Sequence, residues 1–373
     1  MAFRKDKQSD QISKMSVFKK IIRFPFIAIN VAVSLLLIFS CYGSMAAPIG
    51  RWPFAALSGL AFPFLFIATI VFLVLWLITW KKGALISVVT ILVCIGPILR
   101  YCPINFSKSD ANPDLTVLTF NTESFGYDNN GDASASNPLL QHVTSLGAQI
   151  LLFQEARTSV LNDIDRNMEL NGEYPYRFTD KDHMQACISK YPIISHETIP
   201  FNKAAGGNSC LYLRLLVEGD TLAVFNCHLQ SNSLVQEDFD EYHHFIENPS
   251  DSILYAGSKK ILGKLLKSTG LRATQAELVR EKAQAETAKY LIVCGDFNDT
   301  PLSYSFHVFD RFLTDVYGTV GRGPGITYHE HRLFYRIDHM FCNSALTPVS
   351  SHVDRGNTDS DHYPVISQFK LNK

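Results

Sequence analysis

The 373-residue chain lacks several motifs that identify common enzyme classes. It contains no GxSxG, so a serine hydrolase with a nucleophile elbow has no support. It contains no GxxxxGK[ST], which argues against a P-loop nucleotide site. No CxxC occurs, and no Cys-His cluster has the spacing of a zinc site. Internal repeats and low-complexity tracts are also absent, so we expect an ordinary folded chain.

The net charge of −1 conceals two parts of opposite charge. Residues 1–100 carry 11 basic and 2 acidic side chains, whereas the remainder carries 23 basic and 33 acidic ones. Binding to duplex nucleic acid depends on a basic surface, which the acidic part provides poorly.

The cysteines do not decide whether the chain lies in a reducing or an oxidising compartment. Disulfides stay possible, but Cys227 and Cys294 lie in strand-like runs and are predicted to be buried free thiols.

Apolar residues of the first 100 positions gather in three runs, at about 24–42, 54–80 and 84–99. A helix needs about 20 residues to span a bilayer, so the first two runs are long enough and the third is borderline. A cleaved signal peptide is the competing interpretation of the first run, but further membrane-length runs follow it. We therefore expect about three transmembrane helices and an anchor in the lipid bilayer.

The predicted division of the chain follows from these runs. A basic cytoplasmic tail covers 1–23, the membrane region 24–100, a linker 101–113 and a catalytic domain 114–373. Basic residues precede the first run, and Lys81 and Lys82 lie between the second and third runs. The positive-inside rule therefore places the N-terminus and the Lys81 turn in the cytoplasm.

This orientation predicts an integral protein of the inner or plasma membrane with an extracytoplasmic catalytic domain, because three spans carry the chain across. If the third run is re-entrant, the domain stays inside.

The acidic part alternates strand-like runs with helical patterns. Strands are predicted at 115–120, 148–154, 186–195, 210–219, 221–229, 290–297, 325–331, 335–343 and 362–369. Helices are predicted at 137–146, at 252–288 with a break near Gly270, and at 303–311. Many strands with hairpin and helical connections indicate the α+β class, as a four-layer α/β sandwich of two packed mixed β-sheets flanked by helices.

Six of these strands carry carboxylate, carboxamide or imidazole groups at or near an end. They are Asn121 and Glu123, Glu155, His228, Asp296 and Asn298, Asp338 and His339, and Asp361 and His362. Any one has an ordinary explanation as a turn or cap, but their repetition indicates one crevice. Oxygen donors suit Mg²⁺, with Mn²⁺ or Ca²⁺ also possible, and with His and Asp they fit phosphoester hydrolysis.

Seven motifs in order resemble those of the endonuclease/exonuclease/phosphatase superfamily, which includes pancreatic deoxyribonuclease, apurinic endonucleases, inositol-polyphosphate phosphatases and neutral sphingomyelinases. They are "FNTES", "LLFQEAR", "ACISKYPI", "NCHLQSN", "CGDFND", "ITYHEHRLFYRIDHMF" and "SDHYPVIS", and they span nearly all of 114–370.

The resemblance implies a role for each matching position. Asn121 would contact metal or phosphate, and Glu155 would be the principal metal ligand. His228 would bind and polarise the scissile phosphate. Asp296 would align or deprotonate the attacking water, which Asn298 would orient.

The last two motifs complete the implied set. Asp338 would hold the ring of His362, which would stabilise the pentavalent oxyanion or act as an acid-base group. Asp361 would support the metal. His339 follows Asp338 along a strand and should face the opposite side, so it is predicted to be structural.

Three assignments are tentative. Glu123 stands where some relatives carry Asp and is a tentative metal ligand, and Arg157 and Arg336 would contact substrate or neutralise neighbouring acids. No protein partner is inferred.

We expect a metal-dependent phosphodiesterase or phosphatase that acts on a lipid headgroup or another small phosphoester. A nuclease acting on DNA or RNA is the alternative. An inactive membrane-anchored binding protein is disfavoured because Glu155, His228, Asp296 and His362 are all present.

Overall fold

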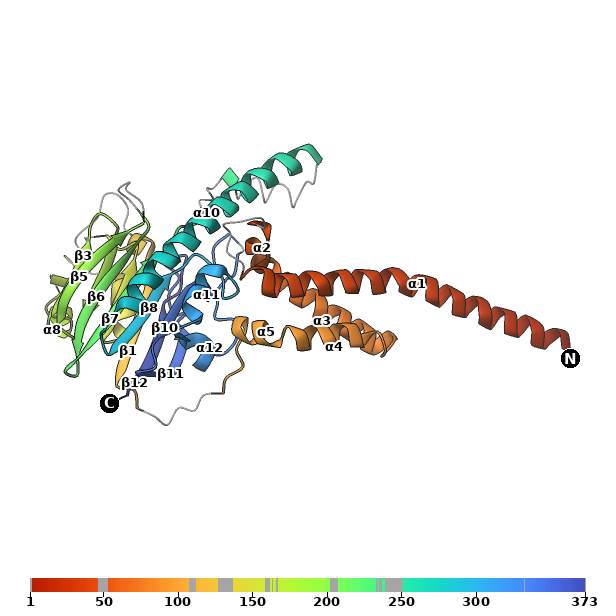
Figure 1. Cartoon of the computed structure of the whole chain (residues 1–373), viewed down its shortest axis with the longest axis horizontal. Coiled ribbons are helices and arrows are strands. Elements are labelled where there is room, and N and C mark those ends of the chain that lie inside the picture. Colours follow the sequence, from red (N-terminus) through yellow and green to blue (C-terminus); the bar gives the residue numbers. More distant parts are fainter. Residues whose placement is uncertain are drawn as a thin grey trace.

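The computed structural model combines a β-sandwich with a projecting group of N-terminal helices (Figure 1). It describes residues 2–45, 53–106, 112–126, 137–157, 162, 164–165, 167–201, 207–232, 234, 237–238, 251–331 and 333–372.

The N-terminal helices include two stretches that are long and apolar enough to cross a bilayer, Arg23–Gly43 and Phe54–Thr79. At 1.5 Å per residue, the 21 residues of the first reach about 30 Å, the thickness of the hydrocarbon core. The helices Ala84–Val93 and Ile95–Tyr101 meet at a bend of 68°. They make a third span only if the two helices together count as one spanning segment. The elements are α1 (Ala2–Gly43), α2 (Pro53–Leu57), η1 (Ser58–Ala61), α3 (Phe62–Thr79), α4 (Ala84–Val93) and α5 (Ile95–Tyr101).

These helices run back and forth beside one another. The guanidinium carbon of Arg23 lies 5.3 Å from the ring centre of Trp80, which places the start of the first stretch beside the end of the second. At the other end, the Tyr42 hydroxyl donates to the carbonyl of Val93 at 2.6 Å. The chain thus leaves the sandwich along α3 and returns to it along α4 and α5 (Figure 1).

The sandwich consists of two six-stranded sheets, with orders β11-β12-β1-β2-β4-β3 and β5-β6-β7-β8-β10-β9. Pairs β1/β2 and β7/β8 are parallel and the other pairs antiparallel, so both sheets are mixed. The strands are β1 (Leu115–Asn121), β2 (Ile150–Gln154), β3 (Tyr176–Asp180), β4 (Gln185–Ser189), β5 (Ile193–Pro200), β6 (Ser209–Val217), β7 (Asp220–His228), β8 (Tyr290–Asp296), β9 (Thr314–Asp315), β10 (Asp338–Cys342), β11 (Leu346–Val353) and β12 (Val365–Leu371).

The central strands of each sheet are buried on both faces, and their successive side chains point to opposite sides. In β1, Leu115 and Val117 join the core between the sheets, whereas Leu118 and Phe120 pack under α6 (Pro138–Ser145). The outer face of the second sheet packs against α10 (Asp251–Ala285) and α11 (Tyr304–Asp310). Shorter elements are η2 (Glu123–Gly126), α8 (Met168–Glu173) and α12 (Val316–Val320). The predicted four-layer sandwich is confirmed.

Three sequence predictions differ from the structure. The run predicted at 186–195 is two strands, β4 and β5, which belong to different sheets on either side of Tyr191 and Pro192. The helical pattern at 252–288 forms one helix, α10, without a break at Gly270. A single glycine costs only about 1 kcal/mol within a helix, which the flanking helix formers offset. The run at 325–331 forms isolated bridges at Tyr328 instead of a strand.

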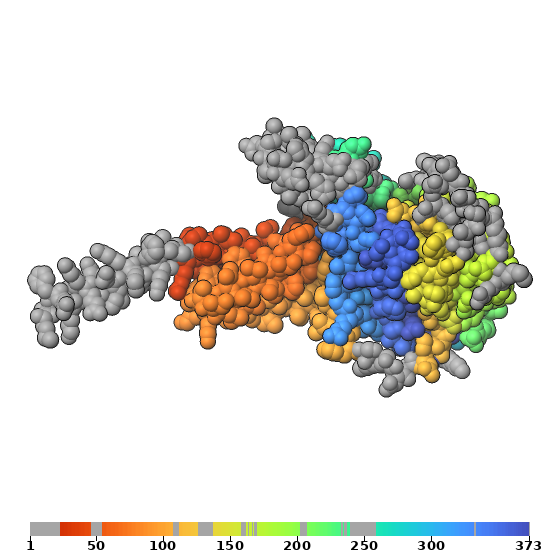
Figure 2. Space-filling view, turned by 180° about the vertical axis from the view of Figure 1, so that it is seen from behind, coloured from red at the N-terminus to blue at the C-terminus, as the bar shows by residue number. Residues whose placement is uncertain are grey.

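The N-terminal helices are packed directly onto the sandwich. Leu302, which follows β8, is buried in a cluster with Cys41, Phe62, Cys94 and Tyr101 of the N-terminal helices. The space-filling view shows these helices abutting the C-terminal part of the chain (Figure 2).

Polar contacts reinforce this joint. Arg100 Nη2 lies 2.6 Å from Asp310 Oδ2, and Asn105 Nδ2 donates to the carbonyls of Gly318 and Gly321. The described part of the predicted linker, 101–106, is therefore held against the domain.

Gly295 in β8 lies directly beside Cys227 of the parallel strand β7. Its φ is +119°, and a Cβ there would lie 2.0 Å from the carbonyl oxygen of Cys227 in β7. Alanine therefore meets both backbone strain and a clash with backbone, neither of which a side-chain rotation relieves.

We predict that Gly295→Ala lowers stability by at least about 3 kcal/mol, roughly 6–12 °C in Tm for a domain of this size. Gly147→Ala is the matched control, because Gly147 has φ +74° with nothing within 4 Å of an added Cβ. The control should lose about 1 kcal/mol. Thermal unfolding of the full-length protein in detergent measures both, and equal losses would contradict the steric explanation.

Candidate active site

The sequence-predicted polar groups meet at one edge of the sandwich. The parallel pairs β1/β2 and β7/β8 bring the carboxyl ends of four strands to the same edge. Strand register then pairs His228 with Asp296 and Asp296 with Asp338, because β10 runs antiparallel to β8. His362 lies just before β12 and reaches the same place.

Asp296 is the centre of the arrangement and is 1% exposed. Its carboxylate accepts hydrogen bonds from Asn121 Nδ2 at 3.0 Å, from the backbone N–H of Asn298 at 2.8 Å and from Asn298 Nδ2 at 3.1 Å. Burial raises the pKa of Asp296 above its ordinary value, and the Asp338 carboxylate adds to this, whereas His362 and His228 oppose it. The carboxylate is thus a stronger base than an exposed one.

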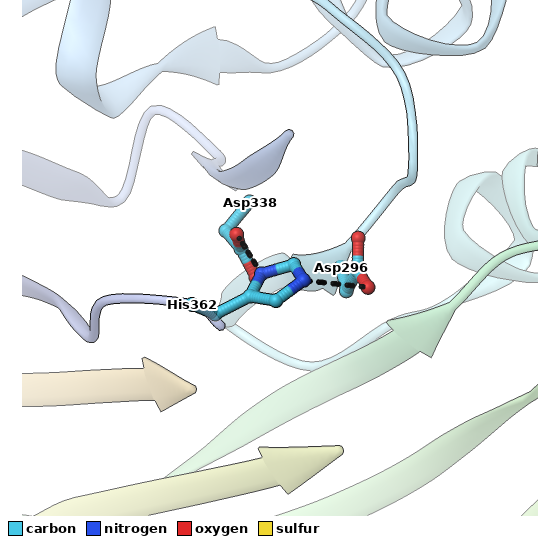
Figure 3. A group of neighbouring side chains, drawn as sticks. All are labelled: Asp296, Asp338 and His362. Atoms are coloured by element: carbon cyan, nitrogen blue, oxygen red, sulfur yellow. Dashed lines mark hydrogen bonds and ion pairs between the residues drawn. The ribbon is translucent and has the colours of Figure 1, made fainter. Parts of the chain in front are cut away.

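His362 lies between two carboxylates (Figure 3). Its Nδ1 is 2.8 Å from Asp338 Oδ2, and its Nε2 is 3.8 Å from Asp296 Oδ2. Burial lowers the pKa of His362, but the Asp338 and Asp296 carboxylates outweigh burial and raise it to about 10. The contact between Asp338 and His362 that the sequence predicts is present, and the ring is held as an imidazolium.

His339 points away from this group, as strand alternation predicts. Its Nε2 is 2.8 Å from the carbonyl oxygen of Asp299, and its ring packs edge-on against Phe297 and Phe306. Burial, with the nearby charge of Arg336, lowers the pKa of His339 to about 3. This ring is therefore a neutral part of the packing under α11.

Glu155 forms the more open side of the site. Its Oε1 accepts from Asn121 Nδ2 at 3.1 Å and lies 3.5 Å from His228 Nε2, and its side chain is 34% exposed. Glu155 and Asn298 both adopt positive φ, 54° and 52°. Such strain in residues other than glycine costs about 1–3 kcal/mol each and gathers at functional sites.

Carboxylates are crowded around the opening. The backbone N–H of Asp361 donates to Glu123 Oε2 at 3.2 Å. Burial raises the pKa of Asp361 to about 7, and the Glu123, Glu155 and Asp296 carboxylates add to this against His362. This excess of negative charge is what a divalent cation would neutralise, so the donor set fits Mg²⁺ or a similar ion.

Two groups of ligand atoms could be considered for such an ion. Asp296, Asp338 and His362 place ligand atoms within 4.8 Å of one another, but all three are buried. His362 already bonds Asp338 and carries a proton, so an ion there would have to displace it. Glu155 and Asn121, at the open side, fit a cation better because water and substrate oxygens can complete its coordination.

A cavity of about 480 Å³ opens at these residues. Its polar lining includes Asn121, Glu155, Asp296, Asn298, Asp361 and His362, together with Ser231, Asn232, Asp238, Asp299, Thr300 and His331. Its apolar and aromatic lining consists of Leu60, Phe64, Leu234, Ile261, Leu265, Tyr328, Leu333, Tyr335 and Ile337. No Lys or Arg is among the described residues that line it.

Both arginines predicted to contact substrate lie outside this lining. Arg336 is buried, its guanidinium carbon lies 4.4 Å from the ring centre of Tyr317, and Nη2 donates to the carbonyl of Arg100 at 2.6 Å. Arg336 therefore joins the sandwich to the N-terminal helices, and its charge opposes the rise that burial causes in the pKa of Asp315. This fits the alternative that Arg336 neutralises a neighbouring acid. Arg157 is partly buried after β2 and does not reach the cavity.

Sequence reasoning missed Thr327 and Tyr328. The Thr327 hydroxyl accepts from the backbone N–H groups of Ile337 and Asp338, and the Tyr328 ring packs edge-on against His362 with ring centres 5.2 Å apart. Both residues lie in "ITYHEH", which the sequence analysis predicts as a strand. Nothing in that run indicates that they would contact Asp338 and His362. Leu60 and Phe64 were missed because only the folded chain brings them to the site.

Comparison with solved structures gives a likeness of fold. A humanized D. rerio TDP2 with 14 mutations aligns with TM-score 0.50 and 16% identity, over 69% of this chain and 99% of that one. An endonuclease/exonuclease/phosphatase from Bacteroides vulgatus gives 0.49 and 17%, over 70% and 100%. One from Beutenbergia cavernae gives 0.49 and 18%, over 70% and 72%. No curated protein matches the chain.

Two family profiles match the sequence. A domain family of unknown function (DUF8431) matches residues 19–101, the membrane region. The profile of the Endonuclease/Exonuclease/phosphatase family matches residues 118–362, which include Asn121, Glu155, His228, Asp296 and His362. Because this match spans more than half of the chain and agrees with the fold and the arrangement of the site, the chain belongs to the endonuclease/exonuclease/phosphatase family.

Proposed function

We propose that the chain is a divalent-metal-dependent phosphoester hydrolase that is anchored in a membrane and acts on a lipid headgroup or another small phosphoester. The observation that supports it is the gathering of Asn121, Glu155, Asp296 and His362 in one cavity, with His228 beside Glu155 and Asp296. Carboxylate bases, an imidazolium and a cation site together are what hydrolysis of a phosphoester by water needs.

Asp296 would prepare the attacking water. Water adds its oxygen to phosphorus and loses a proton, and the buried Asp296 carboxylate, whose pKa is raised, accepts that proton. Asn298 keeps the carboxylate in place through its backbone N–H and its Nδ2. The constraint on Asn298 explains why a strained backbone is retained there.

His362 would act on the charge that develops on the phosphoryl group. Negative charge grows on the equatorial oxygens as the P–O bond to the leaving group breaks, and a nearby imidazolium stabilises it. Asp338 fixes the ring by accepting from Nδ1, which leaves Nε2 directed toward Asp296 and the cavity. His228, whose Nε2 lies 3.5 Å from Glu155, is placed to bind a phosphate oxygen.

Glu155 with Asn121, and Asp361 beside them, would hold the metal ion, with Glu123 as a tentative further carboxylate. When bound, a divalent ion polarises the phosphoryl oxygens and neutralises charge on the leaving group.

The cavity favours a small or lipid phosphoester over a polymer. Nucleic-acid binding takes many contacts from basic side chains to successive phosphates, and no Lys or Arg is among the described lining residues. The cavity also lies where the sandwich meets the membrane region, since Leu60 and Phe64 line it.

Rapid nicking of supercoiled plasmid by the full-length protein would favour a nuclease instead.

The arrangement of the helices supports an extracytoplasmic catalytic domain. Arg23 and Trp80 lie together at one end of the N-terminal helices. Leu302 of the sandwich packs against the opposite end of these helices. The basic tail and the Lys81 turn would therefore lie across the membrane from the sandwich, if α4 and α5 complete a third span.

We predict that Asp296→Asn lowers kcat for bis-p-nitrophenyl phosphate at least about 100-fold, because the amide cannot accept the water proton. The full-length protein in detergent with Mg²⁺ is assayed for release of nitrophenol. Asp220→Asn is the control, since Asp220 forms only a surface ion pair with Lys289 and should keep wild-type activity. Unchanged activity in Asp296→Asn would refute the role of Asp296.

A chelator should abolish hydrolysis and added Mg²⁺ should restore it. In Glu155→Gln, the Mg²⁺ concentration for half-maximal activity should rise about tenfold or more, because one carboxylate ligand is lost. Glu197→Gln, which removes an exposed partner of Lys282, should leave this concentration unchanged. Full activity in the presence of chelator would exclude the metal-dependent mechanism.

An alkaline phosphatase fused after Lys373 should be active in cells, because this reporter works only outside the cytoplasm. The same reporter fused after Lys82 should be inactive, since the positive-inside rule places that turn in the cytoplasm. Cell-based phosphatase activity measures both fusions. If both fusions were inactive, α4 and α5 would not span and the domain would face the cytoplasm. An active Lys82 fusion with an inactive Lys373 fusion would invert the predicted orientation.

A further inference from the structure

We infer that the catalytic cavity continues into a subsite for one acyl chain of a membrane lipid, formed jointly by the membrane region and the catalytic domain. The inference rests on the proposed function, because it assigns the part of the substrate beyond the phosphoester. The acyl-chain subsite is formed by Leu60 of η1, Phe64 of α3, Ile261 and Leu265 of α10, and Leu333.

The acyl-chain subsite is continuous with the catalytic groups. Tyr328 packs against the His362 ring, and its backbone N–H and carbonyl pair with those of Tyr335. The Tyr335 hydroxyl in turn donates to the carbonyl of Leu60 at 3.2 Å. A chain of direct contacts therefore joins the His362 imidazole to Leu60 of η1, along one wall of one cavity.

The acyl-chain subsite is also continuous with the bilayer. Leu60 and Phe64 belong to Phe54–Thr79, a stretch long and apolar enough to cross a membrane. Phe64 is 66% exposed although it lines the cavity, and Ile67, one turn further along α3, is 61% exposed. Side chains so placed on a spanning helix face lipid, so the apolar end of the cavity opens where acyl chains lie.

The chemistry of the lining identifies the occupant. The lining combines carboxylates and the His362 ring, which suit a metal-bound phosphoester, with the five apolar side chains of the acyl-chain subsite. The Asp238 carboxylate, which also lines the cavity, is paired with Lys260 and Lys264. A volume of about 480 Å³ is that of a small-molecule site, enough for a headgroup and the upper part of one chain. A phospholipid fills both parts of the cavity, and the remainder of its acyl chains stays in the bilayer. A polar sugar phosphate would leave the apolar side chains of the acyl-chain subsite exposed to water.

Alkyl phosphates provide a probe that does not depend on the identity of the headgroup. Butyl, hexyl and octyl phosphate are tested as inhibitors of bis-p-nitrophenyl phosphate hydrolysis by the full-length protein in nanodiscs. If the alkyl chain enters the acyl-chain subsite, inhibition should strengthen about fourfold for each added methylene. In Leu265→Asn and Phe64→Asn, the gain in inhibition per added methylene should fall below twofold, because each substitution places an amide against the alkyl chain.

Matched controls separate the acyl-chain subsite from partition into the nanodisc. Leu278→Asn lies on the same helix as Leu265, and Ile67→Asn lies on the same helix as Phe64, but neither residue lines the cavity. Both should keep the wild-type dependence on chain length, since partition is the same for all variants. A dependence that is absent in wild type, or equal in all variants, would overturn the subsite while hydrolysis itself upholds the proposed function. Absence of hydrolysis would instead overturn the proposed function.

Discussion

The carboxylate of Asp296 is buried at the edge where the two sheets meet, and the catalytic arrangement depends on keeping it there. Burying a charge costs several kcal/mol unless other groups compensate it. Asn121, His228, Asn298 and His362 do so, and they come from both sheets and from separate parts of the chain. Gly295 makes this possible, because the absence of a Cβ lets β7 lie close enough to bring His228 beside the carboxylate. The site is therefore complete only when both sheets are in place.

Much of this arrangement is encoded locally and was predictable. Strand ends rich in polar residues indicated a shared edge, and the alternation of side chains along β10 separated Asp338 from His339 correctly. What could not be predicted depends on tertiary contacts. The apolar run at 186–195 gave no sign that β4 and β5 belong to different sheets. Arg336 lies two residues before Asp338 in the same motif, yet its guanidinium turns toward Tyr317 and Arg100, because a side chain's direction depends on what packs beside it.

The joint between the sandwich and the membrane helices is part of the site as well as an anchor. Leu302, only a few residues beyond Asp296, is buried among apolar side chains of the N-terminal helices, and Arg100 pairs with Asp310 of α11. Cutting the chain after the helices would expose Leu302 and remove Leu60 from the cavity wall. The cavity at the candidate site therefore belongs to the whole molecule, including its N-terminal helices.

Direct packing of Leu302 and Asn105 against their partners leaves the catalytic cavity at a fixed height and tilt relative to the helices. An enzyme on a long tether samples a volume of solution, but one held in this way samples only a plane. Encounters with a lipid substrate would then be set by lateral diffusion and by the number of substrate molecules per unit area of membrane. Dilution with inert lipid would slow such an enzyme, whereas dilution with buffer would not.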